Sequence, residues 1–132
     1  MVTQYTLTWT SKVKDVLGPE YAFVDEERTR ETDLRDLLTH CTGLNNVGWP
    51  SMAEFYERFE YNNWAYALLS HVVEVLSGEY YETTLEKRNF KPLEMNESRL
   101  LGKTITANAP GMAKPYFNAE NKLILTDPSI YE

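Results

Sequence analysis

Few side chains in this sequence have the type and spacing that chemistry requires. His40 and His71 each stand alone, without a companion at metal-ligand spacing, so we assign neither of them a site. Cys41 is the single cysteine, which excludes an internal disulfide and a thiolate metal cluster within one chain. We interpret it as a small buried residue beside a helix end. The sequence therefore gives no reason to expect a metal ion or a cofactor.

Acidic side chains form two short groups, and each group has an explanation that needs no catalysis. Asp33 and Asp36 fall where an apolar stripe begins, and negative charge there favours the first turn of a helix. The run from Asp25 to Glu27 lies in a polar stretch and is typical of a solvated loop. Neither group is predicted to act as an acid–base pair.

The composition is that of an ordinary folded domain with an acidic surface. The 132 residues are 42% hydrophobic and 25% charged, close to the average of globular chains. This length allows one core, so we expect one compact unit. The formal charge of −7 would repel a phosphate backbone, which argues against nucleic acid as a partner. No apolar stretch is long enough to span a bilayer, and no signal-peptide pattern opens the chain.

Two helices are predicted with clear boundaries. The first covers about residues 33–41, with a cap at Thr32, a stripe of leucines and an end at Gly43. The second is a long apolar run that begins with a cap at Asn63 and ends at Gly78. Apolar residues surround nearly the whole axis of the second helix. We therefore expect it to be packed on several sides in a core.

The other segments give weaker patterns. They predict a helical turn over 11–17, a polar surface connection over 20–31 and a short helix or irregular turn over 52–59. Residues 80–88 have an amphipathic helical pattern and would pair with the preceding helix as a helical hairpin. Farther on, two runs with strand character flank residues 118–121, as expected of a β-hairpin.

Three stretches carry motifs that are more specific than these patterns. Residues 32–44 read TDLRDLLTHCTGL, residues 59–78 read FEYNNWAYALLSHVVEVLSG, and residues 90–95 read FKPLEM. Together they resemble the serine β-lactamase-like family, which includes class C β-lactamases, DD-peptidases and related esterases. The corresponding family motifs are R-D-L-L-T-H-T-S-G-L, F-x-Y-S-N-x-x-Y-x-L-L-G-x-V-x-E-x-x-S-G and P-L-G-M. In the last of them, Glu94 stands in place of the glycine.

The resemblance implies roles for Tyr61 and Asn63, which occupy the family's Tyr-x-Asn motif. In the family the phenol transfers a proton, and it can serve as a base only where cations and hydrogen bonds favour its phenolate form, since a phenol has a reference pKa of about 10. The amide orients the substrate or the nucleophile. Both residues also have a plain alternative, because asparagine is a good helix cap and tyrosine is common at the rim of any fold.

The motif that holds the nucleophile in this family, Ser-x-x-Lys upstream of the tyrosine, has no counterpart at the expected place. Ser11 and Lys14 have that spacing, but they align with the stretch that follows the nucleophile helix, and the interval to Tyr61 is too short. The family's last motif, Lys or His followed by a small residue and glycine, is also absent. Lys103 and Thr104 are followed by Ile105 and come too early in the chain.

The predicted architecture is α+β, mainly helical, with the β-lactamase/transpeptidase-like fold represented by its helical subdomain and a C-terminal hairpin. Residues 1–132 would form a single, incomplete β-lactamase-related domain. The complete protein would hydrolyse an amide or ester of a small molecule or peptide through a serine acyl-enzyme, and the chain as given is expected to be inactive. Two alternatives remain: a non-catalytic interaction or scaffold domain derived from this fold, and a helical module unrelated to the family. The sequence does not fix the compartment, and an intracellular location is compatible with it.

Overall fold

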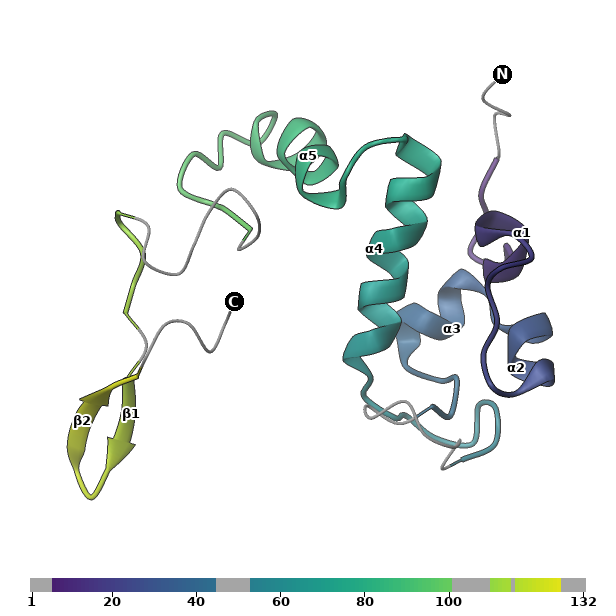
Figure 1. Ribbon diagram of the computed structural model, residues 1–132, viewed down its shortest axis with the longest axis horizontal. Coiled ribbons are helices and arrows are strands. Elements are labelled where there is room, and N and C mark those ends of the chain that lie inside the picture. The colour runs from purple at the N-terminus through teal and green to yellow at the C-terminus, as the bar shows by residue number, and fades with distance from the viewer. Residues whose placement is uncertain (1–5, 45–52, 101–109, 115, 127–132) are drawn as a thin grey trace. The chain divides into compact units, whose positions relative to one another are not determined.

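A computed structural model of the chain describes residues 6–44, 53–100, 110–114 and 116–126. The elements in chain order are α1 (Val13–Leu17), α2 (Glu26–Glu31), α3 (Leu34–Thr39), α4 (Asn63–Ser77), α5 (Tyr81–Leu85), a π-helical turn (Glu86–Phe90), β1 (Tyr116–Ala119) and β2 (Lys122–Leu125) (Figure 1). They belong to two compact units, Met1–Thr84 and Leu85–Glu132. The assignment of both units to a single domain stays a prediction.

Helix α1 is the helical turn expected near residue 13, and backbone bonds hold it against the start of α3. The amide of Val13 donates to the carbonyl of Thr32 at 3.1 Å, and the amide of Leu34 donates to the carbonyl of Ser11 at 3.2 Å. Val13 itself is fully buried. Gly18 then ends the helix at a φ of +86°, a conformation that glycine adopts without strain.

The expectation that residues 20–31 form only a polar surface connection is wrong for the second half of that range. Asp25 caps helix α2, because its carboxylate accepts hydrogen bonds from the amides of Glu27 and Arg28. Arg28 is only 5% exposed and lies inside the unit. Its guanidinium donates to the carbonyls of Thr42 and Ala53, in distant segments, and to the carboxylate of Asp25, the cap of the same helix. These bonds allow so polar a helix to contribute to the interior.

Helix α3 confirms the helix expected over about 33–41, but its cap is Asp33 instead of Thr32. Asp33 and Asp36 form a capping box in which each carboxylate accepts the other residue's amide, at 3.0 and 2.9 Å. Both acidic residues are buried, and their hydrogen bonds offset the cost of that burial. The helix ends at His40, which has a left-handed backbone conformation with φ 58° and ψ 34°.

Helix α4 begins and ends almost where the sequence indicates, with two differences. Its cap is Asn62, one residue before the expected Asn63, and it ends at the left-handed Gly78. The expected burial on several sides is not found among the described residues: only Ala65 and Val72 are buried, whereas Trp64 and Val75 are 66% and 47% exposed. The helix therefore presents one side to the core and leaves apolar side chains on its other sides exposed.

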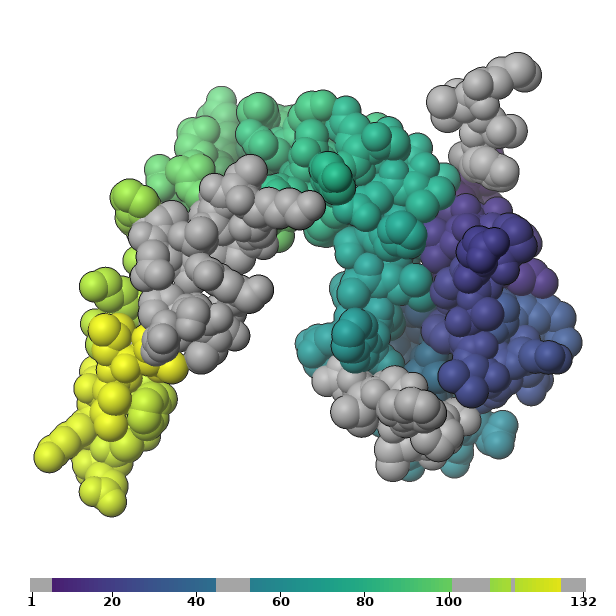
Figure 2. Space-filling model, in the orientation of Figure 1, coloured from purple at the N-terminus to yellow at the C-terminus, as the bar shows by residue number. Residues whose placement is uncertain are grey.

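The core of the first unit lies between α1, α3 and α4. It contains Val13, Leu34, Leu37, Ala65 and Val72. Partly buried side chains around it come from α1, α4 and the segment before α2. Figure 2 shows the purple and blue atoms of α1 and α2 packed into one body with the teal atoms of α4. This packing fixes the end of α3 close to the start of α4, where the predicted site residues lie.

The remaining segments follow the sequence patterns in part. Residues 53–60 form irregular turns, one of the two forms expected there. The helix expected over 80–88 is α5, continued from Glu86 by the π-helical turn, and its pairing with α4 as a helical hairpin stays a prediction. Two hydrogen bonds nevertheless join the adjoining ends of the two helices, from the Tyr81 amide to Glu74 and from the Thr84 hydroxyl to Ser77.

The expected β-hairpin is confirmed in the second unit. Strands β1 and β2 are antiparallel, with Tyr116 opposite Leu125 and Ala119 opposite Lys122. Glu120 and Asn121 connect them with φ values of 50° and 63°, the positive pair that a type I′ turn requires. Most side chains of both strands are exposed.

Candidate functional site

The two predicted site residues lie together where the chain enters α4. Tyr61 precedes the helix and is 59% exposed, and Asn63 is the first residue of the helix and is also exposed. Between them lies Asn62, which is only 3% exposed. The Tyr-x-Asn motif therefore displays its first and third side chains and buries its second.

Asn62 has the structural role that the sequence analysis considered for Asn63. Its side-chain oxygen accepts a hydrogen bond from the Ala65 amide at 3.1 Å, which caps α4. Its side-chain nitrogen donates to the carbonyl of Leu44 at 3.1 Å. Asn62 thus ties the start of α4 to the chain that leaves α3, and Asn63 is not required as the cap.

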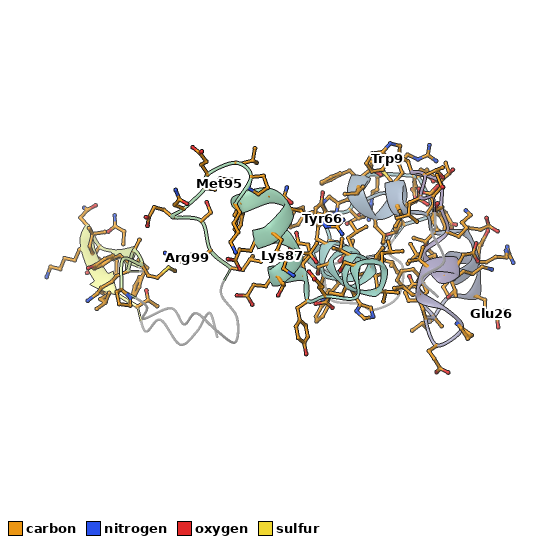
Figure 3. The ribbon with its side chains drawn as sticks, turned by 90° about the horizontal axis from the view of Figure 1, so that it is seen from above. Trp9, Glu26, Tyr66, Lys87, Met95 and Arg99 are labelled. Carbon is orange, nitrogen blue, oxygen red and sulfur yellow. The ribbon has the colours of Figure 1, made fainter. Side chains whose placement is uncertain are left out.

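The ring of Tyr61 lies against His40, the residue that ends α3. The two ring centroids are 4.9 Å apart with planes inclined by 50°. Phe59 and Tyr66 also contact the imidazole, at centroid distances of 5.2 and 5.1 Å. Tyr66 projects from α4 (Figure 3), and its hydroxyl donates to the carbonyl of Leu38. We call His40, Phe59, Tyr61 and Tyr66 the His40 aromatic cluster.

The hydroxyl of Tyr61 makes no hydrogen bond to any other residue that the structure describes. Tyr56, the other tyrosine near the end of α3, differs from it, because its hydroxyl donates to the buried carboxylate of Asp36. Partial burial of that hydroxyl and the bond to Asp36 raise the pKa of Tyr56 to about 12. Tyr56 is therefore held as a neutral hydrogen-bond donor, whereas the hydroxyl of Tyr61 has no such bond within the described residues.

A buried arginine connects the chain on both sides of residues 45–52 to α2. The guanidinium of Arg28 donates to the carbonyl of Thr42 at 2.8 Å and to the carbonyl of Ala53 at 2.6 Å, and it also pairs with Asp25. Gly43 packs so closely here that a β-carbon on it would clash with the carbonyl oxygen of Ala53. Arg28 therefore fixes Thr42 and Ala53 relative to each other, although sequence analysis assigned the segment no function.

The other residues considered for chemistry make contacts within their own segments or lie outside the described residues. The hydroxyl of Ser11 accepts a hydrogen bond from the Thr8 amide at 2.9 Å, and within the described residues it makes no bond to Lys14 or Tyr61. Cys41 is partly buried, and its thiol faces the carbonyl of Thr39. His71 pairs with Glu74 on the exposed side of α4. Lys103, Thr104 and Ile105 lie outside the described residues.

Sequence reasoning predicted the Tyr-x-Asn motif as a site but did not predict His40 as its neighbour. The reason is that His40 was interpreted as a lone surface or core histidine without a site. Among the described residues no group of three metal-ligating side chains is found. A signal was present, since His40 lies at the end of a predicted helix in a matched motif.

Within the described residues, no helix has both the length and the low polarity needed to cross a bilayer.

Comparisons with known proteins agree on one family. The family model described as Beta-lactamase matches residues 1–120. The chain is 22% identical to the unguisins hydrolase of Aspergillus violaceofuscus, over 94% of this chain and 26% of that protein. It is 29% identical to penicillin-binding protein 4 of Amycolatopsis lactamdurans, over 69% of this chain and 29% of that protein.

A solved structure shows the same fold. The octameric penicillin-binding protein homologue from Pyrococcus abyssi matches 90% of this chain with a TM-score of 0.69 and 22% sequence identity. The match covers 33% of that protein. The chain therefore spans about a quarter to a third of the length of the relatives it matches. The likeness confirms the fold expected from the sequence, and it excludes the alternative of an unrelated helical module.

Proposed function

Because the chain belongs to the beta-lactamase family and has the β-lactamase/transpeptidase-like fold, we propose that it carries the Tyr-x-Asn part of a serine hydrolase active site. In this proposal Tyr61 transfers a proton to or from the reacting group, and Asn63 positions the substrate or the nucleophile. The substrate is an amide or ester of a small molecule or peptide, attacked by a serine that forms an acyl-enzyme.

The observation that carries the proposal is that the structural role and the proposed chemical roles fall on different residues of the motif. Asn62 is buried and caps α4, so neither Tyr61 nor Asn63 is needed for that structural task. The ring of Tyr61 is held by His40, while its hydroxyl is bonded to none of the described residues. A fixed ring with an available hydroxyl is what a proton-transferring phenol needs.

The nucleophile is proposed to lie outside residues 1–132. Ser11 is engaged with Thr8 and makes no bond to Lys14 among the described residues, which supports the proposal that the Ser-x-x-Lys spacing at 11–14 is not the nucleophile pair. Since the relatives are three to four times as long as the matched part, there is room in a longer product for both missing motifs. By itself, the chain as given is expected to hydrolyse nothing.

A second candidate function is a non-catalytic interaction or scaffold domain that has kept this part of the fold. The exposed apolar side chains of α4 favour it, because Trp64 and Val75 would be stabilised by a partner that covers them. This candidate predicts that no longer product with a serine nucleophile exists.

The test is to sequence the full-length transcripts of the locus and to assay the encoded proteins with a chromogenic β-lactam and a p-nitrophenyl ester. We expect a transcript with Ser-x-x-Lys upstream and Lys or His-x-Gly downstream, whose product hydrolyses at least one of the two substrates. The 132-residue chain, assayed in parallel, should leave both intact. If no transcript contains either motif, the enzyme proposal fails and the scaffold function is favoured.

A further inference from the structure

We propose that His40 is the positioning residue of the Tyr-x-Asn motif, because it bonds to the backbone on both sides of Tyr61 and packs against the tyrosine ring. This role rests on the proposed function of Tyr61 and Asn63. It assigns to His40 a task that neither the family match nor the sequence pattern gives it.

Backbone hydrogen bonds alone already fix the position of His40 at the end of α3. Its left-handed conformation, with φ 58°, ends α3, and its amide faces the carbonyls of Asp36 and Leu37. Histidine is among the few residue types other than glycine that are enriched in this conformation. The carbonyl of His40 then accepts a hydrogen bond from the amide of Glu60 at 2.9 Å. The residue before Tyr61 is thereby held against the end of α3.

The side chain of His40 holds the residue after Tyr61. Its Nδ1 atom accepts a hydrogen bond from the amide of Asn62 at 3.2 Å. This contact assigns the neutral tautomer with its hydrogen on Nε2, because a protonated Nδ1 could not accept. Asn62 is buried, so without His40 its backbone amide would lose this acceptor in a place that water does not reach, which is unfavourable.

His40 therefore binds both residues that flank Tyr61 in the chain. Glu60 bonds to the carbonyl of His40 and Asn62 bonds to its imidazole, while the ring of Tyr61 lies 4.9 Å from the same imidazole. Phe59 and Tyr66 complete the His40 aromatic cluster and limit movement of the imidazole. A shift of His40 would move the phenol and the start of α4 together.

Other tasks for His40 do not fit its surroundings. It is only 7% exposed and its Nδ1 is occupied, so it is not placed to exchange protons with a substrate. It belongs to no group of three metal-ligating side chains within the described residues. Four of its neighbours, Phe59 to Asn62, belong to one segment, whose position these contacts fix.

The test uses the full 132-residue chain labelled with ¹⁵N. We expect a through-hydrogen-bond ¹⁵N–¹⁵N coupling between the Asn62 amide and Nδ1 of His40. We also expect the Asn62 amide to be protected from hydrogen exchange. His40→Leu should lower that protection by about tenfold or more, the equivalent of about 1.4 kcal/mol. His40→Asn should restore most of it, because asparagine tolerates the left-handed conformation and has an acceptor oxygen in the δ position.

The outcomes separate the positioning role from the catalytic proposal. Absence of the coupling in the wild-type chain, or equal protection of the Asn62 amide in His40→Leu and His40→Asn, overturns the role of His40 even if the leucine variant folds poorly. In the longest product of the locus, His40→Leu should reduce the kcat of hydrolysis and His40→Asn should recover it. If the coupling and the rescue of protection are observed while Tyr61→Phe leaves hydrolysis unchanged, the proposed function fails and the structural role of His40 stands.

Discussion

The side-chain oxygen of Asn62 accepts a hydrogen bond from the amide of Ala65 at 3.1 Å, and this bond separates the tasks of two adjacent asparagines. Asn62 caps α4 from a buried position, whereas Asn63 starts the helix with its side chain exposed. The family motif has serine where this chain has Asn62. Serine and asparagine are both strong helix caps, so the substitution preserves the local structure.

Replacement of the two asparagines should therefore affect stability unequally. Asn62→Ala removes the cap of α4 and the bond to Leu44, and should lower the free energy of unfolding by about 1–3 kcal/mol. Asn63→Ala should cost less than Asn62→Ala, because the side chain of Asn63 is exposed and alanine favours helices. Urea unfolding of both variants measures the difference, and equal losses would contradict the assignment of the cap.

Replacing Arg28 should lower the free energy of unfolding far more than replacing its exposed neighbour Arg30. Arg28→Met leaves the carbonyls of Thr42 and Ala53 without their donor, and we expect a loss of about 2–4 kcal/mol in the free energy of unfolding. Arg30→Met is the matched control on the same helix. Its side chain is 62% exposed and pairs with Glu31 at the surface, so its replacement should change the free energy of unfolding far less than that of Arg28.

Chemical denaturation of the two methionine variants tests this difference directly. Similar losses in both would mean that the guanidinium of Arg28 contributes no more than a surface charge. The role of Arg28 as the connection between α2, Thr42 and Ala53 would then be wrong.

Glu94 occupies a conformation that favours glycine, the residue that the related family motif has there. Its φ is 55°, in the left-handed region. Glu94→Gly should therefore stabilise the second unit by about 1 kcal/mol, because it removes a steric cost that residues with a β-carbon pay. Hydrogen exchange of the amides around the turn, such as that of Met95, should slow in the variant. Faster exchange there would show that the side chain of Glu94 stabilises the turn.

Ionisation of Tyr56 should lower the free energy of unfolding at alkaline pH. Partial burial and the bond to Asp36 raise its pKa to about 12 in the folded protein, against 10.0 for an ordinary phenol. A group whose pKa is higher in the folded state stabilises the fold below its unfolded pKa and loses that effect as pH rises through the folded value. Stability contributed by the phenol should thus be complete below about pH 10 and decline toward about pH 12.

The variant Tyr56→Phe isolates this effect. The loss of unfolding free energy between about pH 9 and about pH 11 should be smaller in Tyr56→Phe than in the wild type, because the variant has no phenol to ionise. Burial also raises the pKa of Tyr21, but that tyrosine is present in both proteins and cancels in the comparison. Parallel pH profiles of the two proteins would show that the bond to Asp36 does not control Tyr56.

Local sequence signals predicted α3, α4 and the hairpin well, because caps, glycines and apolar spacing act within a few residues of one another. The same signals could not decide between Asn62 and Asn63 as the cap, since adjacent asparagines are equivalent to a local pattern and helix ends shift by a residue or two. They also failed for Arg28. The oxygens of Thr42 and Ala53 that accept its hydrogen bonds are far away in the chain, so an arginine among acidic residues looked solvated.

The candidate site could be predicted only in part for a similar reason. Tyr61 and Asn63 were predicted as site residues because a motif marks them, whereas the contact of Tyr61 with His40 joins segments far apart in the chain and is not a local feature. The predicted burial of α4 on several sides failed because an apolar helix surface shows that a residue prefers burial, without showing which segments cover it. Trp64 and Val75 remain exposed among the described residues.

Hydrolysis by Tyr61→Phe, in the longest protein product of the locus, decides whether Tyr61 belongs to an active site. Tyr116→Phe is the matched control, because Tyr116 is 56% exposed against 59% for Tyr61 and loses the same hydroxyl. We expect Tyr61→Phe to lower kcat/KM by about 10²–10⁴-fold, and Tyr116→Phe to leave it unchanged. If the two variants hydrolyse the ester and the β-lactam as fast as the wild type, Tyr61 is not part of the catalytic machinery.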